Sequence, residues 1–274
     1  MFLPDNIDLG KPEKYILSMR IEPCGFSFLI HDPSDKNIFC FQKTGFSNEI
    51  DLLSNIQRIV FDFNFLTEAF KQTNVIFVSS NYELIPDDFY DKQNMQKFYN
   101  FTHCKDTTYA LTSENQIDGS KLVFELDEDL CLFLKRSLCN PYFYQHNGLL
   151  INYFKKKACL FNGNSMFVHF HEGFADLNCF DVNKNIFYTH TYYKEHYQDL
   201  VFYILSIWEK LNFDQLADHL FISGYYPDYQ MEVILKDYIK TINNNGLFDQ
   251  ITAFGEKVQD IPLDLLILFQ NENY

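Results

Sequence analysis

Apolar segments alternate with turn residues along the first part of the chain. Tyr15–Ile21, Phe26–His31 and Ile38–Gln42 are rich in apolar and β-branched residues, and the turn segments Pro23–Gly25 and Asp32–Asp35 separate them. Short apolar runs bounded by Gly, Pro and Asp are typical of strands joined in hairpins. The pattern therefore predicts a three-strand antiparallel meander.

The same pattern returns later in the chain at a constant offset. Gly173-Phe174 and Lys184–Phe187 repeat Gly25-Phe26 and Lys36–Phe39 (173 − 25 = 148; 184 − 36 = 148). Seven of the fifteen positions in this stretch are identical. The repeat indicates two related halves, each opened by a meander.

Further helices and strands are predicted between and after the meanders. Apolar residues at helical spacing predict the helices, and short β-branched or aromatic runs predict the strands. The helices are expected over Asn48–Arg58, Asn64–Lys71, Asp87–Phe101, Asp127–Leu138, Tyr197–Leu211 and Asp228–Ile239, with a short apolar element at Pro262–Phe269 that docks on the body. The strands are expected at Val75–Ser79, Tyr82–Ile85, Thr107–Thr112, Lys121–Leu126 and His219–Ser223.

Strands alternating with helices after an antiparallel opening predict an α/β protein with mixed sheets flanked by helices. We expect two such domains, over residues 1–157 and 158–274, facing each other across a cleft. Lys155–Lys157 lies just before the second copy. Three charges at that place are expected to form a solvated boundary loop and not a basic binding patch.

Charge and cysteine content narrow the class of protein. The formal net charge of the 274 residues is −15, which repels phosphate backbones and disfavours nucleic acid as a partner. The longest apolar runs, Leu200–Trp208 and Ile261–Phe269, are too short to span a bilayer, and the start of the chain does not read as a signal peptide. Seven scattered cysteines without a Cys-x-x-Cys motif fit reduced thiols. We expect a cytoplasmic protein.

Four segments together resemble a known family. Leu17–Phe28, Tyr82–Pro86, Tyr197–Leu205 and Leu220–Gly224 occur in the order found in an uncharacterised bacterial family of domains of unknown function with an actin-like ATPase fold. The resemblance covers nearly the whole chain and implies two tandem ribonuclease-H-like domains. The same superfamily includes sugar kinases, chaperone ATPases and scaffolds of pilus assembly, so the fold does not specify the function.

The resemblance also implies where a nucleotide would bind. Active members of the superfamily hold the phosphates with one glycine hairpin per domain, and a glycine turn after a later strand binds the adenosine. By this resemblance Gly25, Gly173 and Gly224 mark the cofactor-binding positions. Ser27 could donate to a phosphate or be an ordinary strand serine.

The expected catalytic positions are altered. Active members carry an Asp two residues before each hairpin glycine, whereas this chain has Pro23 and His171 there. Glu22 and Glu172 are shifted by one residue, which turns a strand side chain to the opposite face. Neither hairpin is expected to supply a nearby Lys or Arg, and phosphoryl transfer needs positioned metal and charge. We therefore predict weak or absent ATPase activity, with no cofactor beyond vestigial ATP and magnesium binding.

Other chemistries have weaker support. His169 and His171 share a strand face and His190 follows on the third strand, which allows a zinc site or simply hydrogen-bonded histidines. Cys24 beside the glycine turn would need a cationic neighbour to be reactive. Asp260 and Asp264, like other acidic residues of this chain, are expected on surfaces and at helix starts.

Three functions remain open from the sequence. The first is a non-catalytic binding or scaffold protein with a protein partner and a degenerate nucleotide site. The second is a nucleotide-dependent enzyme, an ATPase or small-molecule kinase, that uses Glu22 and Glu172 in the interdomain cleft. The third is a metal-dependent nuclease of the same fold, which the acidic composition disfavours. No catalytic residue and no metal ligand is assigned.

Overall fold

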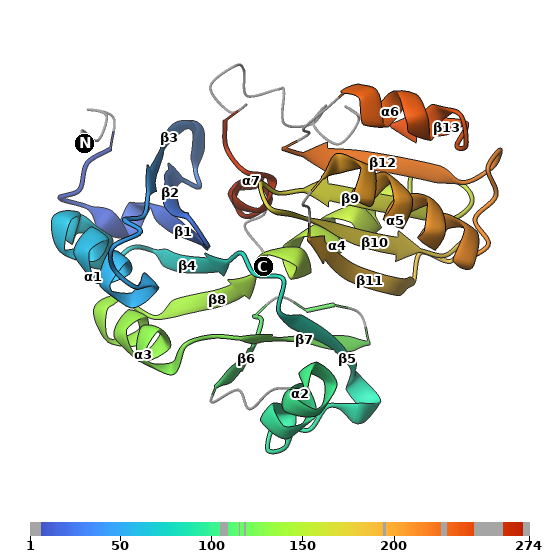
Figure 1. Cartoon of the computed structure of the whole chain (residues 1–274). Coiled ribbons are helices and arrows are strands. Elements are labelled where there is room, and N and C mark those ends of the chain that lie inside the picture. Colours follow the sequence, from blue (N-terminus) through green and yellow to red (C-terminus); the bar gives the residue numbers. More distant parts are fainter. Residues whose placement is uncertain are drawn as a thin grey trace. The chain divides into compact units, whose positions relative to one another are not determined.

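The computed structural model describes residues 7–104, 109–114, 116–117, 119–193, 196–225, 229–243 and 260–270 (Figure 1). The chain forms two compact units. The first unit contains the residues up to Leu149 and, from the other end of the chain, those from Asp264 onward. The second unit runs from Leu150 to Leu263. A single boundary between residues 157 and 158 assigns the end of the chain to the second domain. The structure instead places the residues from Asp264 onward in the first unit.

The first unit is built on a five-stranded sheet in the order β3-β2-β1-β4-β8. β1, β2 and β3 are antiparallel neighbours, and β4 and β8 add to them in parallel. The predicted meander is therefore present, and the sheet is mixed as expected. The strand bounds are β1 Ile16–Glu22, β2 Gly25–Asp32, β3 Asp35–Gly45, β4 Gln72–Phe77 and β8 Pro141–Gln145.

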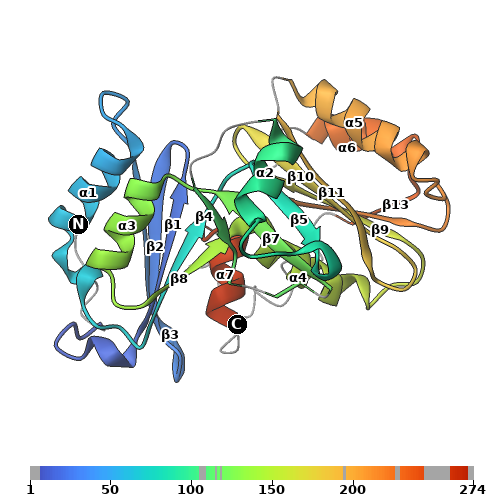
Figure 2. The ribbon, with the colours of Figure 1, turned by 90° about the horizontal axis from the view of Figure 1, so that it is seen from below.

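Helices cover both faces of this sheet. Figure 2 shows α1 (Leu52–Asp62) and α3 (Glu128–Ser137) on one face and α7 (Leu263–Gln270) on the other. Side chains alternate between the faces of a strand. Leu17, Met19 and Ile21 of β1 are buried on the face of α1 and α3, whereas Ser18 and Arg20 point to the face of α7. Asp51 and Asp127 cap α1 and α3 by accepting backbone N–H bonds from Ser54 and Leu130.

A three-stranded antiparallel sheet, β5-β7-β6, also belongs to the first unit. Its strands are β5 Tyr82–Pro86, β6 Ala110–Thr112 and β7 Ser120–Glu125, and α2 (Met95–His103) packs on it. The buried Tyr99 of α2 contacts Ile85 and Val123 in a small core. This sheet lies at the bottom of Figure 1.

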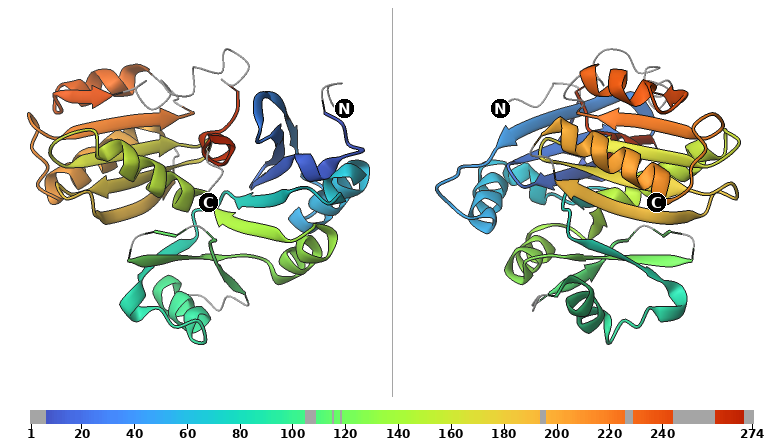
Figure 3. Two further views of the ribbon diagram at one scale, coloured as in Figure 1. Left: turned by 180° about the vertical axis from the view of Figure 1, so that it is seen from behind. Right: turned by 45° about the vertical axis from the view of Figure 1, so that its right-hand side comes forward.

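The second unit repeats the main sheet with the same order of strands, β11-β10-β9-β12-β13. Again three antiparallel strands are followed by two parallel ones. α5 (Tyr197–Lys210) and α6 (Tyr229–Lys236) cover one face, and α4 (His146–Ala158), which leads from the first unit into the second, covers the other (Figure 3). The strand bounds are β9 Ser165–Phe170, β10 Phe174–Phe180, β11 Ile186–Tyr193, β12 His219–Gly224 and β13 Thr241–Asn243.

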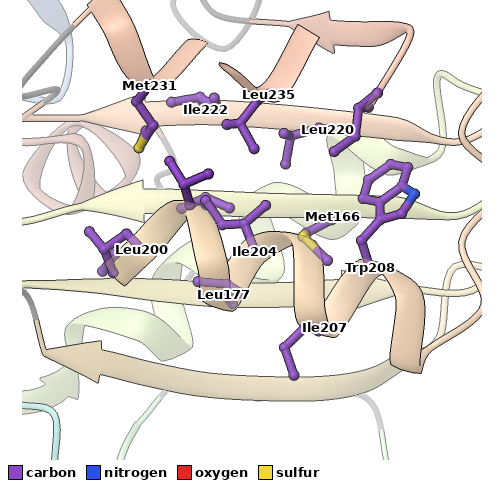
Figure 4. Packing of buried hydrophobic residues seen from close by; sticks show 14 of the residues in the cluster. Met166, Leu177, Leu200, Ile204, Ile207, Trp208, Leu220, Ile222, Met231 and Leu235 are labelled. Carbon is purple, nitrogen blue, oxygen red and sulfur yellow. The ribbon is translucent and has the colours of Figure 1, made fainter. Parts of the chain in front are cut away.

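The core of the second unit lies between this sheet and α5 with α6. Leu200, Ile204 and Trp208 of α5 pack on Met166 and Leu177 of the strands, as Figure 4 shows. The apolar stripe predicted for this helix is therefore core. On the other face, the ring of Phe154 in α4 stacks on Phe167 with centroids 4.7 Å apart.

The two meanders correspond at an offset of 149, one more than the sequence repeat suggests. Arg20 pairs with Ser27 in the first unit and His169 with Asp176 in the second (169 − 20 = 149; 176 − 27 = 149). The third strands keep the offset of 148, because Ser27 pairs with Lys43 and Asp176 with Thr191. Irregularities between β2 and β3 and between β10 and β11 absorb the difference. The visible repeat is thus one residue out of register in the hairpin strands, which exchanges the two faces.

Several predicted elements differ in detail. The helix expected over Asn64–Lys71 is a short 3₁₀ turn, η2 (Asn64–Thr67), and that over Asp87–Phe101 is divided into η3 (Asp87–Phe89) and α2. Lys155–Lys157 lies in the last turn of α4, where cations interact favourably with the helix dipole, and is not a loop. The aromatic run of β8 was not predicted as a strand. The start of the helix expected at Asp228 and the start of the strand expected at Thr107 lie outside the described residues.

Candidate functional site

Buried polar residues gather on one face of each main sheet, opposite α1 and α3 in the first unit and opposite α5 and α6 in the second. In the first unit they include Ser18, Arg20, Ser27 and His31. Burying polar groups is costly unless they are bonded, so these faces are where specific chemistry is expected. The corresponding set in the second unit is His169, His171, Asp176, Asn178 and Ser223.

Arg20 forms a buried ion pair with Asp264 of α7. Its Nε lies 2.8 Å and 3.0 Å from the two carboxylate oxygens of Asp264, and its Nη1 lies 2.6 Å from Glu22. Arg20 and Asp264 are both buried, whereas the Glu22 side chain is 39% exposed. Burial opposes the charge of Arg20, but the two carboxylates more than offset it, so its pKa is raised. The hairpin therefore does carry a cation, which corrects the expectation of no Lys or Arg there.

Ser27 lies directly opposite Arg20 and is 2% exposed. Its hydroxyl has no hydrogen-bond partner within the described part of the chain. Gly25 starts β2 two residues earlier on the same face, and a Cβ there would lie 3.1 Å from the Thr44 carbonyl and 3.3 Å from the Glu22 carboxylate. Gly25 and Ser27 are thus brought together beside a buried guanidinium.

His31 ends the polar face of β2. It is 2% exposed, its Nδ1 has no partner among the described residues, and its ring packs edge-on against Phe269 of α7 at 4.9 Å between centroids. The ring of Phe39 also packs edge-on against the ring of Phe269. Burial lowers the pKa of His31 to about 4, so the imidazole is neutral at pH 7.

The second hairpin is built differently. Gly173 lies in the turn before β10, where a Cβ would meet nothing within 4 Å, and the neighbouring Glu172 is exposed. The acidic residue on the sheet face is Asp176, which is fully buried. It accepts a bond from the Thr191 hydroxyl and lies 2.9 Å from His171 Nε2. Gly173 is therefore not placed as Gly25 is.

His169 and His171 share the face, as their spacing predicts, with ring centroids 4.8 Å apart. His169 Nδ1 lies 2.9 Å from the Ser223 hydroxyl, and His171 is held by Asp176. His190 pairs with Leu177 and contacts Tyr192, which packs on the core beneath α5. It lies on the opposite face, which corrects the suggestion that it joins the other two histidines.

Gly224 ends β12 with φ of +87°. A Cβ there would lie 2.2 Å from the carbonyl oxygen of Phe170, so only glycine fits. Tyr225, which follows, is 67% exposed and donates its backbone N–H to the same carbonyl. The glycine is required by the close strand–strand approach, and this requirement exists without any nucleotide.

Two residues of these faces were not anticipated. Asp264 was expected on the surface or at a helix start; it lies in the first turn of α7, but it is buried against Arg20. It is the single charge in the apolar run Leu263–Phe269, and that isolation was the available signal. Asp176 was not recognised as a residue of the sheet face, because the sequence repeat is one residue out of register in the hairpin strands.

A groove lies on the outside of the first unit, beside α1, η2 and α3. It has a volume of about 810 Å³ and is lined by Arg58, Phe61, Asn64 and Phe133, among others. Phe61 is 84% exposed, which is unusual for so large an apolar side chain. This is a candidate contact surface for a protein.

The two sheets with one strand order, each opened by an antiparallel meander, define an actin-like ATPase fold. The family model described as "Protein of unknown function (DUF3822)" matches residues 4–242, and the chain belongs to this family. Both findings confirm the resemblance and the fold class expected from the sequence. No curated protein matches the chain.

Two solved structures illustrate the fold. A protein from Bacteroides thetaiotaomicron with actin-like ATPase fold and unknown function is 22% identical, with a TM-score of 0.82, and the match covers 97% of this chain and 99% of that one. A chain of the PilM–PilN type IV pilus biogenesis complex is 9% identical, with a TM-score of 0.56, covering 94% of this chain and 97% of that one. At these identities the likeness shows the fold alone. Within the described residues, no helix has the length and apolar character that a membrane span needs.

Proposed function

We propose that the protein is a cytoplasmic binding protein that has kept the actin-like fold without ATP hydrolysis. The observation that carries this proposal is the state of Arg20, the buried cation of the first hairpin. Its guanidinium is neutralised by Asp264 and Glu22. A cation that is already paired is poorly placed to stabilise the charge that develops on a transferred phosphoryl group.

The second hairpin supports the same conclusion. Asp176 is fully buried and bonded to His171 and Thr191. Glu172, which the alternative function would use in place of the missing Asp, lies in an exposed turn. The buried acidic group of this hairpin is thus already engaged by two side chains. We infer weak or absent ATPase activity and no required cofactor.

A protein partner fits this role. The matched chain of similar fold in the PilM–PilN type IV pilus biogenesis complex is part of a protein complex. In this chain the groove around Phe61 offers an apolar anchor and one cation, Arg58, on a protein of net charge −15. An apolar partner segment with a carboxylate is the occupant that this lining suits.

The test of the proposal is an ATP hydrolysis assay with magnesium on the wild-type protein and on Glu22→Ala. We expect no hydrolysis above background from either. Hydrolysis by the wild-type protein that is lost in Glu22→Ala would favour the alternative, a nucleotide-dependent ATPase or kinase. Glu172→Ala is assayed in parallel, because the alternative also gives Glu172 a role, and a loss of hydrolysis in that variant would favour the same alternative.

A further inference from the structure

We propose that the protein self-associates through β11: the outer edges of this strand in two copies of the chain pair antiparallel, with His190 of one copy opposite His190 of the other. The inference goes beyond the proposed function and does not depend on it, because the groove around Phe61 belongs to the first unit. β11 lies wholly within the second unit.

β11 is the edge strand of the second main sheet. Within the described residues, β10 is the only strand hydrogen-bonded to it (Figure 1). The ladder between these two strands is regular from Tyr188 to Tyr193, and the irregularity falls at Phe187, which has no opposite residue in β10. An edge strand offers a second row of backbone donors and acceptors to which another strand can be added. The regular portion of β11 is therefore suited to receive a further strand.

The four edges of the two main sheets differ in how they are protected from such pairing. Lysine or proline in an edge strand discourages the addition of another strand, and so does a very short edge strand. β3 carries Lys36 and Lys43, β8 begins at Pro141, and β13 has three residues. β11 has eight residues, Ile186–Tyr193, with no proline and no Asp, Glu, Lys or Arg. Two copies of a chain with net charge −15 can therefore meet at this edge without placing like charges opposite each other.

The sequence of this edge favours a second copy of the same strand as its occupant. Tyr188-Thr-His-Thr-Tyr192 reads the same in both directions. A two-fold axis requires that each contact of residue i with residue j is matched by a contact of j with i. Antiparallel pairing centred on His190 meets this condition and sets tyrosine opposite tyrosine and threonine opposite threonine. Aromatic pairs and threonine pairs are among the favourable cross-strand contacts.

Side chains of this strand are already ordered by their own unit. The hydroxyls of Thr189 and Thr191 donate to side chains of β10. The hydroxyls of Tyr188 and Tyr192 lie 2.6 Å apart. Much of the entropic cost of fixing these side chains is thus met on folding and not on association. His190, between the two tyrosines, is exposed, so the centre of the edge is accessible to a second copy.

The experiment is sedimentation velocity over a range of concentrations, on the wild-type protein and on two charge variants. We expect the wild-type protein to dimerise reversibly. His190→Lys and His190→Glu each place like charges opposite each other at the two-fold axis, so each variant should dimerise at least tenfold more weakly. An equal mixture of the two variants should dimerise again, because opposite charges then face each other. This recovery requires that position 190 meets itself across the interface.

Gln42→Lys is the matched control. Gln42 lies opposite Phe28 in the first unit, as His190 lies opposite Leu177 in the second. The control adds the same charge to the corresponding edge strand, β3, and should leave the dimerisation constant unchanged. Three results would each overturn the proposal: a wild-type protein that stays monomeric, a dimer that survives both folded His190 variants, or a mixture that does not recover dimerisation.

Amide hydrogen exchange of the wild-type protein covers the case in which the variants do not fold. Raising the protein concentration should slow exchange within Tyr188–Tyr192 and leave exchange in β3 unchanged. Equal exchange in β11 at low and high concentration would contradict the pairing. Neither measurement involves ATP hydrolysis or the groove around Phe61, so the pairing can fail while the proposed function stands.

Discussion

Arg20 on β1 lies directly opposite Ser27 on β2, yet its guanidinium bonds to Asp264, 244 positions away in the chain. This contact ties the end of the chain to the hairpin that opens it. A buried pair whose partners are this far apart in sequence can form only after the chain has folded. It is therefore a sensitive probe of the native state of the first unit.

Breaking this pair from one side should strongly destabilise the first unit. Asp264→Ala leaves Arg20 buried with only the partly exposed Glu22, and we expect a loss of about 3–5 kcal/mol. Chemical denaturation measures the loss. The double variant Arg20→Met with Asp264→Leu should recover most of it, because both charges are then absent. Glu22→Gln should cost less than about 1 kcal/mol, and an equal loss there would contradict the dominance of Asp264.

The stability of the first unit should depend on pH through His31. The pKa of His31 is lowered to about 4 by burial, although Asp32 acts to raise it and Lys36 and Lys71 to lower it further. Between about pH 6.5, where an unfolded His titrates, and pH 4, the unfolded chain binds more protons. Stability therefore falls as the pH drops through this window, with a slope of up to about 1.4 kcal/mol per pH unit from this residue.

The check on His31 is denaturation of the wild-type protein and His31→Leu at several pH values. The difference in unfolding free energy between the two should be constant above pH 7. It should shift in favour of His31→Leu as the pH falls from 6.5 to 4. Parallel curves throughout this range would show that His31 is not buried as a neutral group.

Gly224 and Gly173 of the second unit should respond differently to alanine. Gly224→Ala meets the Phe170 carbonyl at a φ of +87°, and we expect a loss of at least about 2 kcal/mol. Gly173→Ala has open space around its Cβ and should change stability by less than about 1 kcal/mol. Thermal denaturation of the matched pair gives the comparison. Similar losses for both would place Gly173 in a tighter turn than the structure shows.

Asp176, and not Glu172, should be the acidic residue on which the second hairpin depends. Asp176→Ala removes the partner of His171 and Thr191 in a fully buried position, with an expected cost of about 2–4 kcal/mol. Glu172→Ala, at an exposed position, should stay within about 0.5 kcal/mol. Urea denaturation measures the loss of stability in each variant. A larger loss in Glu172→Ala than in Asp176→Ala would support the register implied by the sequence repeat.

The general architecture could be predicted because local patterns agree with it. The turn residues around Pro23 and Asp32 define the first meander, and Asp127 begins α3 as its capping position indicates. The repeat of Lys36–Phe39 at Lys184–Phe187 correctly relates the third strands, β3 and β11. These signals lie within a few residues of the structure that they specify.

The register of the hairpins could not be predicted, because identical residues occupy unlike positions. Gly25 is the first residue of β2, whereas Gly173 lies in a turn. The identities at an offset of 148 are genuine, but the irregularity between Cys179 and Phe180 moves the strands by one residue. Only the burial pattern, with Ala175 and Leu177 in the core, shows the true correspondence to Phe26 and Phe28.

The site chemistry was least predictable, because it depends on contacts between distant segments. From the sequence alone, Asp264 is one more carboxylate in an acidic chain. Its role is seen only when the structure places α7 beside Arg20. Likewise, His169 and His171 read as a metal pair until Ser223 and Asp176 are seen to bond them. Sequence spacing supplies the candidates, and tertiary contacts decide what each one does.

The most direct test of the non-catalytic account is a thermal-shift titration with ATP, ADP and GTP, each with and without magnesium. A ligand that binds the folded state at a hundred times its dissociation constant adds about 2.7 kcal/mol, which is readily seen as a rise in Tm. We predict no magnesium-dependent shift with any of the three, because we infer that the protein requires no cofactor. A clear shift that requires magnesium would contradict that inference and establish a nucleotide-binding site.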